Sequence, residues 1–158
     1  FACGQLFTDR AAYIKDVVFN REGSIRKADV IVVPEPNRTR ALENHRSERE
    51  CDTCLTNRIA TLLNIAALQG VDTLIVGAFG CGRQGYPVNQ AIAQFKSWIE
   101  AHPGAIENIV FAVPRVHFET FNKAFGEPEP QTRTEPEVKQ VEEELFDPSD
   151  LPEGVTLR

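Results

Sequence analysis

The sequence predicts an α/β fold in which helices cover a largely parallel sheet. Three short apolar runs, 29–33, 73–77 and 109–113, have the composition of buried strands. The segments between them repeat apolar residues at helical spacing and are long enough to cross over between parallel strands. Right-handed crossovers over 29–77 and 73–113 would place the three strands side by side in one sheet.

The elements before the second crossover have clear boundaries. A strand is expected at 12–19, followed by an Arg-Glu-Gly-Ser turn at 21–24. The strand at 29–33 ends at the Pro-Glu-Pro-Asn sequence 34–37, and a polar stretch follows. Ser47 and Glu50 have the spacing of a capping box and therefore open a helix, which Gly70 ends. The apolar stripe of that helix is Leu55, Ile59, Leu62, Leu63 and Ala66.

The later elements follow the same alternation. A second helix is expected at about 87–101, and the strand 109–113 is closed by Pro114. Phe118, Phe121 and Phe125 mark a short last helix, and their spacing predicts that all three are core residues. Residues 127–158 hold half of the ten prolines and a run of glutamates, which predicts an acidic tail that is extended or docked.

Length and composition favour one domain, residues 1–126, followed by the tail 127–158. The chain has 158 residues and is 42% hydrophobic, enough for a sizeable core. Residues 126–158 carry ten of the 23 acidic residues and three of the 17 basic ones, so the net charge of −6 belongs to the tail. We expect no membrane span and no binding of duplex nucleic acid. Four cysteines in a chain of this size favour reduced thiols and a cytoplasmic (intracellular) location.

Residues 72–87 are the most informative stretch. The strand at 73–77 leads into a loop with four glycines, Gly77, Gly80, Gly82 and Gly85, and Pro87 opens the following helix. Glycines let backbone N–H groups approach an anion, and a helix N-terminus adds about half a positive charge. This order of elements predicts a phosphate-binding loop at the carboxyl end of the sheet.

Two general nucleotide-binding patterns fit the loop imperfectly. Residues 80–85 spell the G-x-G-x-x-G pattern of a dinucleotide-binding turn, but Pro87 places the helix start too late. A Walker loop would need Lys and Ser or Thr where Arg83 and Gln84 stand. An NAD(P)-binding Rossmann oxidoreductase remains a weaker alternative, as does a loop whose glycines serve only a tight turn.

The same residues carry a family resemblance. Residues 75–82, Ile-Val-Gly-Ala-Phe-Gly-Cys-Gly, with Gly85-x-Pro87 after them, resemble the second phosphate loop of the microbial-type poly(ADP-ribose) glycohydrolase family. The likeness extends over residues 8–126 and corresponds to the C-terminal portion of the family's domain. It implies a three-layer α/β/α macro-domain-like mixed sheet that is incomplete at the N-terminus, and binding of ADP-ribose or an ADP-ribosylated protein. It implies neither a metal nor a cofactor.

The resemblance also suggests roles for individual residues. Amides from Phe79 to Gly85 would hold the diphosphate and the distal ribose, Phe79 would lie against that ribose or plug the core, and Arg115 would approach the adenosine side. Gln84 and Tyr86 stand where the family usually has Phe and Asn, and Tyr86 would supply an aromatic face. Cys81 is interpreted as a small packing residue and not as a nucleophile. The candidate ligand-binding residues are therefore Asn37, Ala78, Phe79, Gly80, Cys81, Gly82, Arg83, Gln84, Gly85, Tyr86 and Arg115.

The family's catalytic segment has no match in this sequence. That segment is glycine-rich and ends in Gln-Glu-Glu, and one of its glutamates acts as the acid and base of glycoside hydrolysis. The run Glu142–Glu144 lies in the tail with no glycine loop before it, so we assign no catalytic residue. The first residue is Phe1, and we expect the N-terminal portion of the same domain to be a missing partner. The sequence leaves open whether the chain belongs to a glycohydrolase or is a non-catalytic ADP-ribose-binding module.

Overall fold

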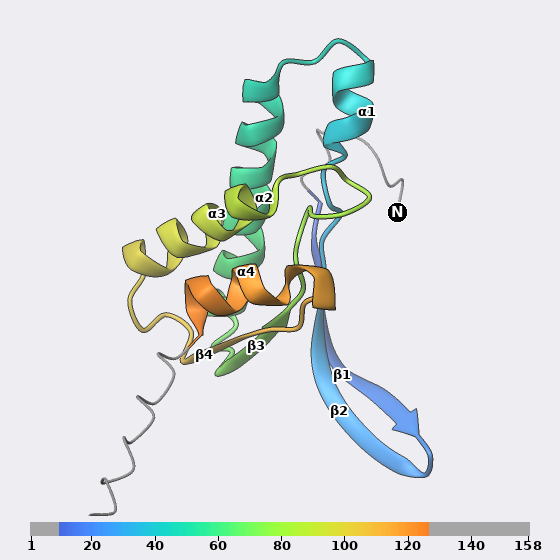
Figure 1. The fold of residues 1–158 in the computed structure, drawn as a ribbon. Coiled ribbons are helices and arrows are strands. Elements are labelled where there is room, and N and C mark those ends of the chain that lie inside the picture. Colours follow the sequence, from blue (N-terminus) through green and yellow to red (C-terminus); the bar gives the residue numbers. More distant parts are fainter. Residues whose placement is uncertain (1–9, 127–158) are drawn as a thin grey trace, which may run out of the picture. The chain divides into compact units, whose positions relative to one another are not determined.

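The computed structural model describes residues 10–126, which form four strands and four helices (Figure 1). The predictions for the tail 127–158 lie outside the described residues. The described elements are listed here in chain order: β1 (Ala12–Arg21), β2 (Ser24–Val32), α1 (Arg38–Glu43), α2 (Glu48–Leu68), β3 (Thr73–Val76), α3 (Val88–Ala101), β4 (Asn108–Phe111) and α4 (Arg115–Phe125). None of the helices described is long and apolar enough to cross a membrane.

Strands β1 and β2 form an antiparallel hairpin that the sequence predicted only in part. Ser24 pairs with Arg21, so β2 begins five residues before the apolar run that marked it. Glu22 and Gly23 both have positive φ angles, 52° and 79°, as a tight hairpin turn requires. Residues 24–28 are exposed, and they are strand because they pair with β1 and not because they are buried.

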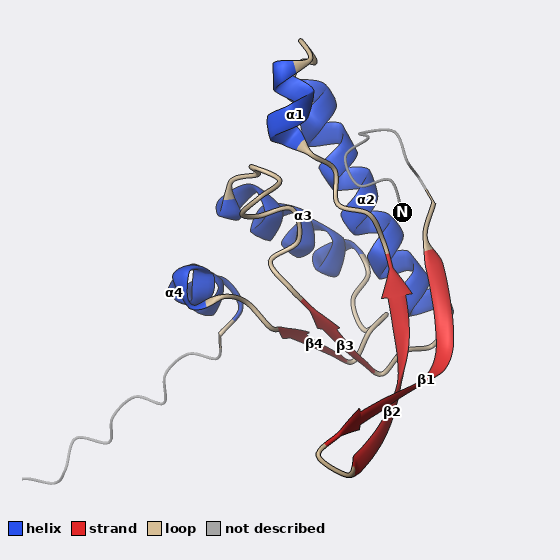
Figure 2. Ribbon diagram, turned by 90° about the vertical axis from the view of Figure 1, so that its right-hand side faces the viewer, coloured by secondary structure: helices blue, strands red, loops and turns tan. Residues whose placement is uncertain are grey.

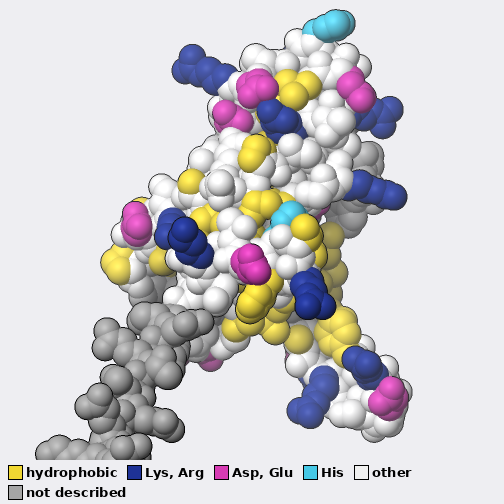
Figure 3. Space-filling view, viewed as in Figure 1, with side chains coloured by type: hydrophobic (Ala, Val, Ile, Leu, Met, Phe, Trp, Pro, Cys, Tyr) yellow, Lys and Arg dark blue, Asp and Glu magenta, His cyan; other side chains and the backbone are white. Residues whose placement is uncertain are grey.

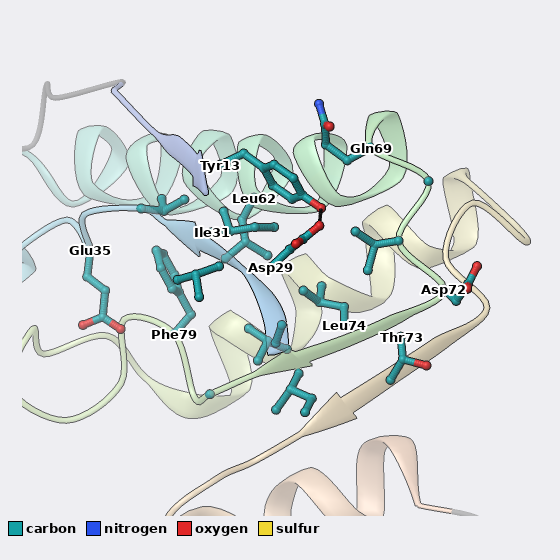
Figure 4. Close-up of a pocket in the computed structure, with 18 residues that line it drawn as sticks. Tyr13, Asp29, Ile31, Glu35, Leu62, Gln69, Asp72, Thr73, Leu74 and Phe79 are labelled. Atoms are coloured by element: carbon teal, nitrogen blue, oxygen red, sulfur yellow. Dashed lines mark hydrogen bonds between the residues drawn. The ribbon is translucent and has the colours of Figure 1, made fainter. Parts of the chain in front are cut away.

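The second sheet confirms the predicted β3–α3–β4 unit. Strand β3 pairs with β4 in parallel, with Leu74 beside Ile109 and Val76 beside Phe111. The prediction of a single three-stranded parallel sheet is wrong, because β2 pairs with β1 and does not pair with β3. Figure 2 shows the two sheets as separate pairs of strands. A groove lies between β2 and β3 in the described residues (Figure 4).

Helices α2, α3 and α4 pack on one face of the β3–β4 sheet. Leu74 and Val76 belong to the core cluster that also contains buried residues of α2 and α3. Phe111 of β4 contacts Phe95 of α3, and its ring stacks on Phe125 of α4 at 4.4 Å. The opposite face is uncovered, so the second helical layer of a three-layer fold has no counterpart among residues 10–126.

Most of the predicted core is confirmed, with one exception in the last helix. Ser47 and Glu50 form the expected capping box, and the predicted stripe of α2 is buried. Phe121 is buried and Phe125 packs against the core. Phe118 is 56% exposed, so its assignment to the core is wrong. Phe118 lies in the first half of α4, where the neighbouring residues 115, 116, 119 and 120 are also exposed, and the described chain does not cover this part of the helix.

Candidate functional site

The glycine loop joins β3 to α3 and is held in two tight turns. The first is closed by a hydrogen bond from the Cys81 N–H to the Ala78 carbonyl oxygen at 3.0 Å. The second is closed by the Gly85 N–H, which donates to the Gly82 carbonyl at 3.0 Å. The Tyr86 N–H donates a hydrogen bond to the Gly80 carbonyl oxygen at 3.2 Å. This bond joins the two ends of the segment 80–86, and the tip of the loop lies between them.

Three of the loop glycines have positive φ angles, but their surroundings differ. A Cβ on Gly80 would lie 2.9 Å from Leu55 Cδ1, and a Cβ on Gly85 would collide with Thr39 Oγ1. A Cβ on Gly82 would meet no atom within 4 Å, although its φ is +89°. Gly80 and Gly85 are therefore required for packing, whereas Gly82 forms the open tip of the loop.

The segment that follows β2 is hydrogen-bonded to this loop. The Glu35 carboxylate accepts a hydrogen bond from the Gly80 N–H at 3.0 Å. The Arg38 and Thr39 N–H groups both donate to the Gln84 carbonyl, at 2.9 and 3.3 Å. Residues 35–39 therefore lie against the glycine loop. Asn37 uses its side-chain oxygen to cap α1, where it accepts from the Arg40 N–H at 2.9 Å.

The backbone N–H groups of the loop divide into two sets. Those of Phe79, Gly80, Cys81 and Gly85 donate to acceptors within the described chain. The bridge between Cys81 and Tyr86 turns the Gly82 N–H toward the Tyr86 carbonyl. The consecutive N–H groups of Arg83 and Gln84 have no acceptor among the described residues. These two donors lie at the open tip of the loop, before the N-terminus of α3.

Both aromatic residues of the loop are buried. Phe79 is 8% exposed and belongs to the core cluster, so of the two interpretations of this residue the burial favours the core plug. Tyr86 is 3% exposed, and its hydroxyl donates to the Cys51 carbonyl of α2 at 2.9 Å. Its ring therefore packs beneath the loop and anchors it to α2.

Cys81 has the surroundings of a packing residue. Its thiol lies 3.7 Å from the Phe79 carbonyl oxygen. Burial, and to a lesser extent the charge of Glu35, raises the pKa of this thiol. A raised pKa keeps the sulfur protonated and unreactive at neutral pH. In the described residues, no cluster of three His, Cys, Asp or Glu side chains is placed to hold a metal ion.

The remaining candidates are not all brought together. Arg83 is exposed beside the open tip, whereas Ala78 is half-buried at the base of the loop. Arg115 is exposed at the first turn of α4 and makes no hydrogen bond or ion pair with the loop in the described residues. It stays a prediction for the adenosine side.

Sequence reasoning missed two charged residues that border the loop. Glu35 stands between Pro34 and Pro36, directly after a predicted strand, and no local pattern marks it as a site residue. Arg38 stands in the polar stretch that follows. Its guanidinium donates a hydrogen bond to the Gly85 carbonyl at 3.4 Å and forms an ion pair with Glu48 at 2.9 Å. Their position directly after a strand, at the edge where ligands bind, was the available signal.

Comparison with solved structures shows which known proteins share this fold. The poly(ADP-ribose) glycohydrolase of Deinococcus radiodurans, in complex with ADP-ribose, superposes with a TM-score of 0.68 at 25% identity, over 77% of this chain and 54% of that one. A mutant of the Thermomonospora curvata enzyme gives a TM-score of 0.67 at 26% identity, over 77% and 51% of the two chains. This chain is similar to microbial poly(ADP-ribose) glycohydrolases.

The similarity to poly(ADP-ribose) glycohydrolases confirms the predicted α/β, macro-domain-like fold. It comes from structure, since no protein-family model and no curated protein matches the sequence. This chain spans about half the length of the glycohydrolases that it matches, with 54% of the Deinococcus enzyme covered.

Proposed function

We propose that this chain binds ADP-ribose through the loop 77–86 and forms part of a glycohydrolase that cleaves O-glycosidic ribose bonds. The observation that carries the proposal is the pair of consecutive unused N–H groups at Arg83 and Gln84, placed after the carboxyl end of β3 and before α3. A similar glycohydrolase from Deinococcus radiodurans has been solved in complex with ADP-ribose.

The diphosphate is the part of ADP-ribose that fits the open tip. Consecutive backbone N–H groups form a concave donor surface for an anion, and the N-terminus of α3 adds a favourable dipole. The buried side chains of Phe79 and Tyr86 support the loop from below and leave recognition to the backbone. Binding through the backbone suits a ligand group that every ADP-ribosyl substrate carries.

Glu35 adds an electrostatic constraint to this site. Its carboxylate accepts a hydrogen bond from the Gly80 N–H and so stabilises the conformation of the loop. The same carboxylate places negative charge near a bound diphosphate. The guanidinium of Arg83 lies beside the tip in solvent and offers compensating positive charge.

The proposed division of labour assigns binding to this chain and hydrolysis to another segment. Cleavage of a ribose glycosidic bond requires a carboxyl group beside the anomeric carbon, acting first as acid and then as base. We propose that the family's Gln-Glu-Glu segment, which does not occur in these 158 residues, supplies that group in the whole protein.

Calorimetric titration of the full chain with ADP-ribose tests the proposal, with AMP and ribose 5-phosphate as partial ligands. The informative variant is Gly82→Asp, which places a carboxylate at the open tip. Gly104→Asp is its matched control, because Gly104 also has a positive φ (+75°) and no atom within 4 Å of its Cβ position. Both variants carry the same backbone strain, but only the first is expected to repel a diphosphate.

The expected loss is large enough to measure. Two phosphate charges about 5 Å from the new carboxylate cost roughly 1.7 kcal/mol in a medium with the dielectric constant of water, which weakens binding more than tenfold. The Gly104→Asp variant should bind as the parent does. Equal affinities of the two variants, or binding of NADPH in preference to ADP-ribose, would contradict the proposal.

A further inference from the structure

The contact between the glycine loop and α1 is built around Arg38. The Arg38 N–H donates to the Gln84 carbonyl at 2.9 Å, and one terminal nitrogen of its guanidinium donates to the Gly85 carbonyl at 3.4 Å. The other terminal nitrogen forms the ion pair with Glu48 of α2 at 2.9 Å. A single residue therefore joins the loop next to its open tip, the first turn of α1 and the start of α2.

Arg38 lies in a charged part of the molecule but is largely covered. Figure 3 shows Lys or Arg side chains interspersed with Asp or Glu side chains over α1 and the start of α2, at the top of the view. The side chain of Arg38 is 21% exposed, whereas that of its partner Glu48 is 68% exposed. Burial raises the pKa of the Tyr86 hydroxyl, and the positive charge of Arg38 opposes this rise. The charge of Arg38 therefore acts on the buried side of the loop.

Two polar atoms at this contact are buried without a hydrogen-bond partner among the described residues. One is Arg38 Nε, which carries a donor hydrogen, and the other is Gln84 Oε1, which is an acceptor. Buried polar groups in native proteins are nearly always paired, so each exception requires an explanation. These two exceptions are complementary, and they lie on residues whose backbones are already bonded to each other.

The unpaired acceptor belongs to a residue of the open tip. Gln84 provides one of the two consecutive backbone N–H groups that have no acceptor among the described residues. An anion bound by the N–H groups of Arg83 and Gln84 would fix the orientation of the Gln84 backbone. The side chain of Gln84 moves with its backbone, so occupancy of the tip and the position of the carboxamide are linked.

We propose that Arg38 is a positioning residue for the phosphate-binding tip, and that the Gln84 carboxamide accepts a hydrogen bond from Arg38 Nε–H when the tip is occupied. This bond pairs both buried atoms at once and holds the tip around the anion, while Glu48 holds the guanidinium from the other side. The bond is absent in the free chain and belongs to the bound state. The inference rests on the proposed binding of ADP-ribose by the same loop.

A double-mutant cycle in ADP-ribose binding tests this bond. Arg38→Lys keeps a positive charge beside Glu48 but has no Nε–H, and Gln84→Met keeps the length of the side chain but has no carboxamide oxygen. Calorimetric titration compares the parent, the two single variants and the double variant. A hydrogen bond to a charged group changes an equilibrium constant by about tenfold or more, so each single variant should lose at least that factor. The double variant should bind no more weakly than Arg38→Lys alone.

The same cycle without ligand separates a positioning role from a merely structural one. The effects of the two substitutions on urea unfolding should be additive, because the bond is absent before binding. Gln84→Met should not lower the stability, since the acceptor that it removes has no partner in the free chain. Gln94→Met is the matched control, because Gln94 is half-buried on α3 and lies outside the loop. Combined with Arg38→Lys, it should be additive in both assays.

Inorganic pyrophosphate is the second probe and separates this inference from the proposed function. It should occupy the same N–H groups with lower affinity and show the same coupling between Arg38 and Gln84. Coupling with pyrophosphate in a parent that does not bind ADP-ribose would support the bond and contradict the proposed function. ADP-ribose binding with additive effects, or equal coupling in binding and in unfolding, would overturn the role of Arg38 alone. Binding of neither probe would overturn both.

Discussion

Replacing Gly80 by alanine tests whether the loop is shaped by packing. The new Cβ would lie 2.9 Å from Leu55 Cδ1 and 3.2 Å from Tyr86 Cδ2, both in the buried core. Forcing a methyl group into a packed core costs about 1–3 kcal/mol. The positive φ of +79° adds about 1–2 kcal/mol of backbone strain. The variant should therefore lose about 2–5 kcal/mol of unfolding free energy.

The matched control is Gly82→Ala, which has a similar φ and an unobstructed Cβ. It carries only the strain, so the difference between the two variants, about 1–3 kcal/mol, isolates the packing cost. Urea unfolding followed by circular dichroism measures both values, with the slope of the transition checked for two-state behaviour. Equal losses in the two variants would refute the packing argument for Gly80.

Three further predictions concern the supports of the loop and of α2. Tyr86→Phe should cost about 1 kcal/mol in the same unfolding assay, because it removes the buried hydrogen bond to the Cys51 carbonyl. Hydrogen bonds from the Ser47 N–H and hydroxyl lower the pKa of Glu50 from its usual 4.5. The stability that the charged Glu50 contributes is therefore present above pH 4.5 and is lost as the pH falls through the lowered pKa of the folded state. The urea unfolding midpoints of the parent and of Glu50→Gln should differ at pH 7 and converge when the pH falls below that pKa. Glu35→Gln keeps an acceptor for the loop but removes the charge, so it should tighten ADP-ribose binding several-fold in calorimetry; unchanged or weaker binding would contradict this.

Local sequence signals were sufficient for the helices and for the position of the loop. The capping box at Ser47 and Glu50 and the apolar stripe of α2 depend on neighbours within a few residues, and such patterns can be read directly. The glycine loop also lies between β3 and α3, as the order of strand, glycines and Pro87 predicts. These features are local, and the sequence therefore predicts them well.

What failed depended on contacts between distant segments. The exposed residues 24–28 are strand because β1 pairs with them, and an argument from hydrophobic periodicity does not include that partner. The gap between β2 and β3 likewise escapes any rule that places consecutive parallel strands side by side. Glu35 gained its role from a loop 45 positions later in the chain.

Two N–H groups of α1 donate hydrogen bonds to the Gln84 carbonyl oxygen, and these bonds couple the position of the loop to that helix. A loop tethered in this way cannot tighten around an anion alone, and the first turn of α1 must follow it. Arg38 transmits any such displacement to Glu48 at the start of α2. An environment-sensitive dye at the α1–α2 junction should therefore report occupancy of the loop from a distance, without touching the nucleotide.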